Sequence, residues 1–237
     1  MFAERTRWNL AANRLSQALA HHRAGGRKLL DLSASNPTEC GFQYDQQAIL
    51  SALCRVEAMH YHPDPLGLKI ARDAVSGYYA GWNVPVDPAS LVLTTGTSEA
   101  YSFVFRLLCN PGDELLIPTP GYPLFDFLAD IQDVKLISYA LFYDHGWHID
   151  FHAVQQLLTP RTRGIVVVHP NNPTGHFTKP DEMRRLSEIC GERGMCIIAD
   201  EVFLDFGLDT HPQSFAANQD ALTFTMSGCP RSPACRR

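Results

Sequence analysis

The sequence predicts an α/β fold with three layers, in which helices cover both sides of a mostly parallel β-sheet. From residue 91 onward, short apolar runs alternate with amphipathic stretches, which is the pattern of repeated strand–helix units. The apolar run at 164–168 is rich in β-branched residues, as is typical of a strand buried on both faces. Residues 1–40 do not follow this alternation. We therefore expect residues 1–40 to be the N-terminal part of a smaller domain and residues 41–228 to form a large, incomplete domain.

The expected elements follow from hydrophobic periodicity and from the turn residues between them. The helix that follows Gly96 ends at the Pro–Gly turn of residues 110–113, and the helix that follows Thr178 has that residue as its N-cap and ends at Gly194. In chain order we expect a helix in the first 20 residues, strands at 28–32, 91–93, 114–117, 134–139, 164–168, 195–199 and 221–226, and helices that include residues 100–108, 122–129 and 183–190. The inner face of the helix after Gly96 is expected to carry Ala100, Phe103, Val104, Leu107 and Leu108.

Composition and charge argue against several classes of function. The chain has a net charge of −5 and no basic stripe, so nucleic acid is not an expected partner. There is no apolar run long enough to span a membrane, and charges from residue 4 onward argue against an export signal. The seven cysteines are scattered without a CxxC pair, and the histidines have no matching set of ligands. We expect a cytoplasmic location, no membrane association and no metal site.

Ligands of parallel sheets bind beyond the carboxyl ends of the strands, so the residues just after each expected strand are candidate site residues. Gly96, Thr97 and Ser98 follow the strand expected at 91–93 and open a helix. The backbone N–H groups and the dipole of such a helix terminus favour an anion such as a phosphate. A plain N-cap with a flexible glycine is the alternative interpretation.

Three further strand ends carry aromatic or polar groups. Tyr122 lies in PTPGYP, where prolines and a glycine would hold its ring for stacking on a flat heterocycle; a purely structural aromatic is the alternative. Asn172 lies in HPNNPTG, a constrained turn that can aim one amide into the crevice. Asp200 ends a buried strand, and its carboxylate needs a cation or a donor. A protonated pyridine nitrogen would serve, and a structural salt bridge is the alternative.

In order and spacing, the segments TTGTSEA, PGYP, HPNNPTG and ADEVF resemble those of the class I and II aminotransferases, which are pyridoxal-phosphate-dependent enzymes of fold type I. The resemblance runs from about residue 30 to about residue 228. It implies pyridoxal 5'-phosphate as the cofactor and a reaction that moves an amino group between an amino acid and a 2-oxo acid. It also implies a role for each candidate residue: Gly96, Thr97 and Ser98 hold the cofactor phosphate, Tyr122 stacks on the pyridine ring, Asn172 bonds the 3-oxygen, and Asp200 keeps the ring nitrogen protonated.

The resemblance further implies contacts with the substrate and with a second subunit. Ser35 and Asn36 occupy the place where the substrate carboxylate meets the backbone in the family. Tyr61, in YHPDPLG, resembles the tyrosine that reaches into the site of the neighbouring subunit. A homodimer is therefore expected for full-length relatives.

The sequence departs from the family pattern at two places. Phe203 stands where the family has a tyrosine that donates to the 3-oxygen, which leaves Asn172 as the donor there. The family's Schiff-base lysine follows the strand expected at 221–226, and this chain has no lysine after Lys179. We therefore expect no catalytic residue and no activity in the chain as written.

The final residues, 229–237, show no periodicity. Deleting one nucleotide from a string that encodes the family-like SGLSKISGLPQMK can yield GCPRSPACRR and a stop, so we expect an aberrant, frameshifted tail. Three interpretations of function stay open at this point. The first is an aminotransferase by family, the second is a non-catalytic remnant, and the third is a carbon–sulfur lyase of the same fold type.

Overall fold

The computed structural model describes residues 2–30, 39, 41–207 and 212–228. Ser35 and Asn36 lie outside these residues, as does the predicted tail at 229–237. The described residues divide into two units between Cys54 and Arg55. The predicted boundary at residue 40 stays a prediction.

The N-terminal unit consists of short helices. It contains the 3₁₀ helix η1 (Glu4–Thr6) and the α-helices α1 (Arg14–Ala24) and α2 (Gln46–Leu53). Asn13 caps α1 by accepting a hydrogen bond from the Ser16 N–H, and Asp45 caps α2 in the same way through Ala48. Neither α-helix has a buried residue, and residues 28–30, where a strand is predicted to begin, are not in a strand.

The larger unit, from Arg55 onward, contains a sheet and the helices around it. Its strands are β1 (Glu114–Thr119), β2 (Lys135–Tyr143), β3 (Trp147–Ile149), β4 (Thr162–Val168), β5 (Cys196–Asp200) and β6 (Thr223–Met226). Its α-helices are α3 (Lys69–Ala80), α4 (Thr97–Leu108), α5 (Phe125–Ile131), α6 (Phe151–Leu157) and α7 (Pro180–Arg193). Its 3₁₀ helices are η3 (Val56–Met59), η4 (Pro88–Ser90), η5 (Leu204–Phe206) and η6 (Phe215–Ala217).

The sheet has the strand order β3-β2-β1-β4-β5-β6, and every described pairing is parallel except that of β2 with β3. The prediction of a mostly parallel sheet is therefore confirmed. The prediction of a strand at 91–93 is wrong, because this segment lies outside the sheet. There the Leu93 N–H donates to the Leu66 carbonyl, and the Leu93 side chain packs where Gly67 lacks a Cβ.

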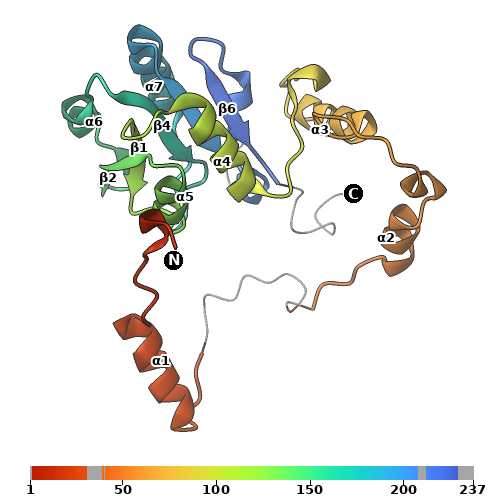
Figure 1. The fold of residues 1–237 in the computed structure, drawn as a ribbon, viewed down its shortest axis with the longest axis horizontal. Helices are drawn as coiled ribbons and strands as arrows, with labels where there is room; N and C mark the ends of the chain where they lie inside the picture. Colours follow the sequence, from red (N-terminus) through yellow and green to blue (C-terminus); the bar gives the residue numbers. More distant parts are fainter. Residues whose placement is uncertain (1, 31–38, 40, 208–211, 229–237) are drawn as a thin grey trace. The chain divides into compact units, whose positions relative to one another are not determined.

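The three layers follow from the alternation of side chains along each strand. In β4, Ile165 and Val167 face one core, which also contains Val154 of α6 and Leu186 of α7. The alternate residues Val166 and Val168 face a second core, formed with α4 and α5. Thus α4 and α5 cover one face of the sheet, and α6 and α7 cover the other (Figure 1). Among the described residues, no helix is long and apolar enough to cross a membrane.

Two details of the helices differ from the sequence prediction. The inner face of α4 is centred on Tyr101 and Phe105, which are buried, whereas Phe103 and Leu107 are exposed. Lys179, rather than Thr178, is the N-cap of α7, and its N–H donates to the Glu182 carboxylate one turn later. The predicted end of α7 at Gly194 is confirmed, because this glycine has the left-handed conformation (φ 62°).

Candidate cofactor site

The N-terminus of α4 presents backbone N–H donors, and its first turn lies near the carboxyl end of β5. Gly96 is its N-cap, with an extended backbone, and its carbonyl accepts from the N–H groups of Glu99 and Ala100. The Glu99 carboxylate turns back and accepts from both the N–H and the hydroxyl of Thr95. The N–H groups of Thr97 and Ser98 belong to the first helical turn, where helix geometry supplies no carbonyl partner. Together with the helix dipole they form a site suited to an anion.

Asp200 lies at the carboxyl end of β5, and its carboxylate is held by two donors. Its Oδ2 accepts from the Tyr101 hydroxyl of α4 at 2.8 Å, and its Oδ1 accepts from the Val202 N–H at 3.1 Å. Both donors are neutral, so among the described residues Asp200 is satisfied by hydrogen bonds instead of the salt bridge that was the alternative. Burial raises the pKa of Asp200, while the hydrogen bonds from Val202 and Tyr101 act in the opposite direction.

The contact between Tyr101 and Asp200 links these two features. Tyr101 follows the first residue of α4 by four positions, which is about 6 Å along the helix axis. The first turn of α4 and the carboxylate at the end of β5 therefore lie on the same side of the sheet, and Tyr101 connects them. This places two of the sequence-predicted groups in one site.

The loops after β1 and β4 are joined by Asn171. Its Nδ2 donates to the Pro120 carbonyl at 3.1 Å and to the Thr174 hydroxyl at 2.9 Å, so it connects the PTPGYP and HPNNPTG segments. Its Oδ1 is buried and has no hydrogen-bond partner among the described residues. Asn172, the residue predicted from the sequence, is half-buried beside it. The peptide bonds before Pro120, Pro170 and Pro173 are cis.

The ring of Tyr122 lies at the surface of the loop after β1. It is 41% exposed and touches Phe125 edge-on, at 5.9 Å between ring centroids. Phe125 in turn contacts Tyr101 edge-on at 5.2 Å. The exposed part of the Tyr122 ring is thus available to a ligand. Its buried side contacts Phe125, which contacts Tyr101, the residue that donates to Asp200.

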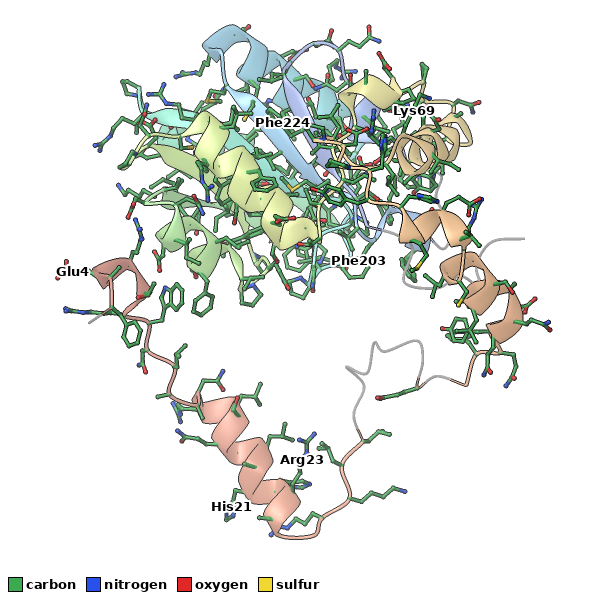
Figure 2. The ribbon with its side chains drawn as sticks, turned by 45° about the vertical axis from the view of Figure 1, so that its right-hand side comes forward. Glu4, His21, Arg23, Lys69, Phe203 and Phe224 are labelled. Carbon is green, nitrogen blue, oxygen red and sulfur yellow. The ribbon has the colours of Figure 1, made fainter. Side chains whose placement is uncertain are left out.

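Phe203 lies three residues after Asp200, just before η5. In Figure 2 Phe203 lies on the side of the sheet where β5 ends, whereas Phe224 pairs with Ile198 in the middle of β5. Its ring contacts Phe206 edge-on and carries no hydroxyl. Tyr61 belongs to a loop segment and is 93% exposed, so its side chain is not gathered with the other candidate residues of this chain.

Two buried polar residues hold the segment before β6 against the strand ends. His169 accepts from the Thr178 N–H at Nδ1 and donates from Nε2 to the Gln213 carbonyl, and burial lowers its pKa to about 4. Glu201 accepts from the Ser214 hydroxyl and the Phe215 N–H, and burial raises its pKa to about 7. These contacts anchor residues 213–215 to the residues that follow β4 and β5.

Tyr101, Asn171 and Glu201 were not predicted from the sequence as site residues. Tyr101 and Phe105 are four residues apart and pack edge-on, so their aromatic spacing was a signal for the inner face of α4. It was obscured by Phe103 and Leu107, which are equally apolar but exposed. The partners of Asn171 and Glu201 are distant in sequence, so no local pattern indicates them.

The chain matches a family of known proteins over most of its length. The family model of class I and II aminotransferases matches residues 27–230. The chain belongs to this family. Members of the class I and II aminotransferases depend on pyridoxal phosphate and act on amino acids and 2-oxo acids.

Individual relatives agree with this assignment. The chain is 30% identical over 206 residues to the glutamate-pyruvate aminotransferase AlaA of Escherichia coli, an alignment that covers 86% of this chain and 51% of that protein. Human tyrosine aminotransferase is 27% identical over 183 residues, covering 76% of this chain and 40% of its own length. The chain thus spans about half the length of the curated relatives it matches.

Solved structures show the same fold. An alanine aminotransferase from Pyrococcus furiosus superposes with a TM-score of 0.84 at 25% identity, covering 96% of this chain and 59% of its own. An aminotransferase from Escherichia coli superposes with a TM-score of 0.78 at 27% identity, covering 91% of this chain and 54% of its own.

The residues present fit the family's cofactor. The helix terminus at Gly96–Thr97–Ser98 suits a phosphate, and no neighbouring heavy atom lies within 4 Å of where a Cβ on Gly96 would stand. The Asp200 oxygens each accept one hydrogen bond and keep further lone pairs for a ring nitrogen. The half-buried amide of Asn172 and the exposed ring of Tyr122 suit the 3-oxygen and the ring face of the cofactor.

Proposed function

We propose that this chain is the cofactor-binding part of an aminotransferase that moves an amino group between an amino acid and a 2-oxo acid. The observation that carries the proposal is the Asp200 carboxylate at the end of β5, hydrogen-bonded to the helix whose N-terminus forms the anion site. The relatives named above are aminotransferases, which favours amino-group transfer over carbon–sulfur lyase activity.

Each residue has a defined task in this proposal. The N–H groups of Thr97 and Ser98, together with the space left by Gly96, hold the phosphate. Asp200 accepts a hydrogen bond from the protonated pyridine nitrogen and thereby keeps that nitrogen charged. When bound, the cofactor supplies the electron sink that stabilises negative charge at the substrate Cα.

The remaining candidate residues orient the ring and the substrate. Asn172 donates to the ring's 3-oxygen, and Tyr122 covers one face of the ring. Phe203 adds apolar contact without a second donor to that oxygen. Ser35 and Asn36 meet the substrate carboxylate in this proposal, and Tyr61 serves the site of a second subunit in a homodimer, for which its exposed side chain is suited.

We also propose that these residues hold the cofactor through non-covalent contacts, because none of the candidate cofactor residues is a lysine. A cytoplasmic location is proposed as well, in keeping with the free thiols of Cys54, Cys109, Cys190 and Cys196.

The test is a fluorescence titration of the chain with pyridoxamine 5'-phosphate, whose binding needs no lysine. The affinity should fall about tenfold or more in Asp200→Ala, because a charged hydrogen bond is lost. Asp181→Ala, which changes an exposed aspartate of α7, should bind as the wild type does. Equal affinity of Asp200→Ala and wild type would reject the proposed site. Treatment with pyridoxal phosphate and borohydride, followed by peptide mapping, should yield no adduct at a specific lysine.

A further inference from the structure

Among the described residues, the Tyr101 hydroxyl is the side-chain donor to Asp200, and it comes from helix α4, which packs on the sheet. Tyr101 is 2% exposed, and its oxygen lies 2.8 Å from Asp200 Oδ2. Burial and the neighbouring carboxylate raise the pKa of Tyr101 well above its usual value. The phenol therefore keeps its proton and always acts as the donor in this contact.

The two donors to Asp200 leave a defined part of its carboxylate open. Oδ1 accepts from the Val202 N–H and Oδ2 from Tyr101, while each carboxylate oxygen can accept about two hydrogen bonds. The neighbouring carboxyl group, that of Glu201, is bonded to Ser214 and Phe215 and does not share these donors. One acceptor position on each Asp200 oxygen thus stays available to a ligand.

Tyr101 is itself fixed on two sides by aromatic rings. It contacts Phe105 edge-on at 5.7 Å and Phe125 edge-on at 5.2 Å. Phe125, which is 1% exposed, also contacts Tyr122. The hydroxyl direction is therefore set by the packed core between α4 and α5, and rotation of the Asp200 carboxylate would break its shortest hydrogen bond.

We propose that Tyr101 is a positioning residue for cofactor binding. Its hydroxyl orients the Asp200 carboxylate and stabilises the negative charge of that group. The proton shared between Asp200 and the cofactor's pyridine nitrogen therefore stays on the nitrogen. The inference rests on the proposed function. A donor to the ionised form of a carboxylate lowers that carboxylate's proton affinity. Without the Tyr101 hydroxyl, the shared proton shifts toward Asp200 and the ring nitrogen loses charge.

The test compares Tyr101→Phe with wild type, using pyridoxamine 5'-phosphate labelled with ¹⁵N at the pyridine nitrogen. The ¹⁵N chemical shift of the bound ligand reports whether that nitrogen is protonated. Wild type should show a protonated nitrogen. Tyr101→Phe should show a resonance displaced toward the unprotonated position, with affinity weakened about tenfold, as expected for loss of one hydrogen bond to a charged group.

Tyr139→Phe is the matched control. Tyr139 is 1% exposed, lies in the other core, and donates its hydroxyl to the Val166 carbonyl at 2.9 Å. This variant loses the same atom from an equally buried site, so a thermal melt of both variants shows that each is folded and how far each is destabilised. Its ligand should keep the wild-type ¹⁵N shift and affinity.

The outcomes separate the inference from the function on which it rests. A ¹⁵N shift in Tyr101→Phe equal to that of wild type would overturn the positioning role, even if affinity falls, because a structural residue alone would weaken binding without moving the proton. Failure of wild type to bind the ligand would overturn the proposed function and this inference with it.

Discussion

The Nδ2 of Asn171 donates to the carbonyl oxygen of Pro120 at 3.1 Å and thereby ties the loop after β4 to the loop after β1. Both loops lie at the carboxyl ends of neighbouring parallel strands. Because Asn171 is almost fully buried, this amide has no water to replace a lost partner. It therefore acts on the site by holding two ligand-bearing loops together.

Asn171→Asp should destabilise the chain by about 2 kcal/mol, because a carboxylate cannot donate to Pro120 or Thr174 and would face the Pro120 carbonyl. Urea denaturation measures this loss. Asn172→Ala is the comparison. Because Asn172 is half-buried, the stability of this variant should change little, whereas its affinity for pyridoxamine phosphate should fall about fivefold. If Asn171→Asp were as stable as wild type, the coupling of the two loops would be contradicted.

Glu201→Gln should change how stability depends on pH. The folded pKa of Glu201 is raised from 4.5 to about 7, so its stabilising contribution is complete below pH 4.5 and is lost as pH rises through 7. Glutamine stays neutral and can still accept from Phe215 and pair with Ser214. Relative to wild type, the variant should therefore gain about 3 kcal/mol between pH 4.5 and pH 8.

His169 has the opposite effect over much of the same range. Its folded pKa is lowered from 6.5 to about 4, so stability is lost as pH falls from 6.5 toward 4. In wild type the two slopes offset each other between about pH 4.5 and 6.5. Urea denaturation across this range should show that stability rises more steeply with pH in Glu201→Gln than in wild type. Parallel profiles would contradict the role given to Glu201.

Gly164→Ala should destabilise the sheet, because the added Cβ would lie 2.5 Å from the Cys196 sulfur and 2.8 Å from the Cys196 carbonyl oxygen. Relief of this overlap requires movement of β4 against β5, at a cost of about 2 kcal/mol. Gly77→Ala in α3, where no atom lies within 4 Å of the new Cβ, should instead gain about 0.5–1 kcal/mol. Thermal melts of the two variants should therefore move in opposite directions.

Phe203→Tyr should increase affinity for pyridoxamine phosphate by about fivefold, because its hydroxyl would add a donor to the ring's 3-oxygen. Phe206→Tyr is the control, since Phe206 packs edge-on against Phe203 but is half-exposed on η5. Its affinity should match wild type. An unchanged affinity in Phe203→Tyr would place residue 203 away from that oxygen.

Much of the fold was predictable because the inner strands are buried on both faces. The β4 and β5 segments are apolar at every inner position, and this pattern needs no tertiary information to recognise. The strand β3 was missed because Trp147–Ile149 is short and pairs only at the antiparallel edge. Residues 91–93 were assigned to the sheet because their apolar sequence does not distinguish a strand from a loop packed against Gly67.

Some residues of the candidate site could be predicted from the sequence, and others could not. Gly96, Asn172 and Asp200 stand in local motifs at strand ends, so the sequence alone indicates them. Tyr101 reaches Asp200 across 99 positions of sequence, and Asn171 reaches Pro120 across 51. Their roles depend on which face of a helix is buried and on which loops are neighbours, and both are decided by packing.

The most direct test of the account is backbone hydrogen exchange of the full chain, with and without pyridoxamine 5'-phosphate. Binding at the end of the sheet should slow exchange in peptides that contain Thr97 and Ser98 and in those that contain Val202, whose N–H bonds Asp200. Peptides from the middle of α7, on the other side of the sheet, should exchange unchanged. Unchanged exchange at residues 97–98 and 202, or slowing confined to other segments, would contradict a cofactor held between the α4 N-terminus and Asp200.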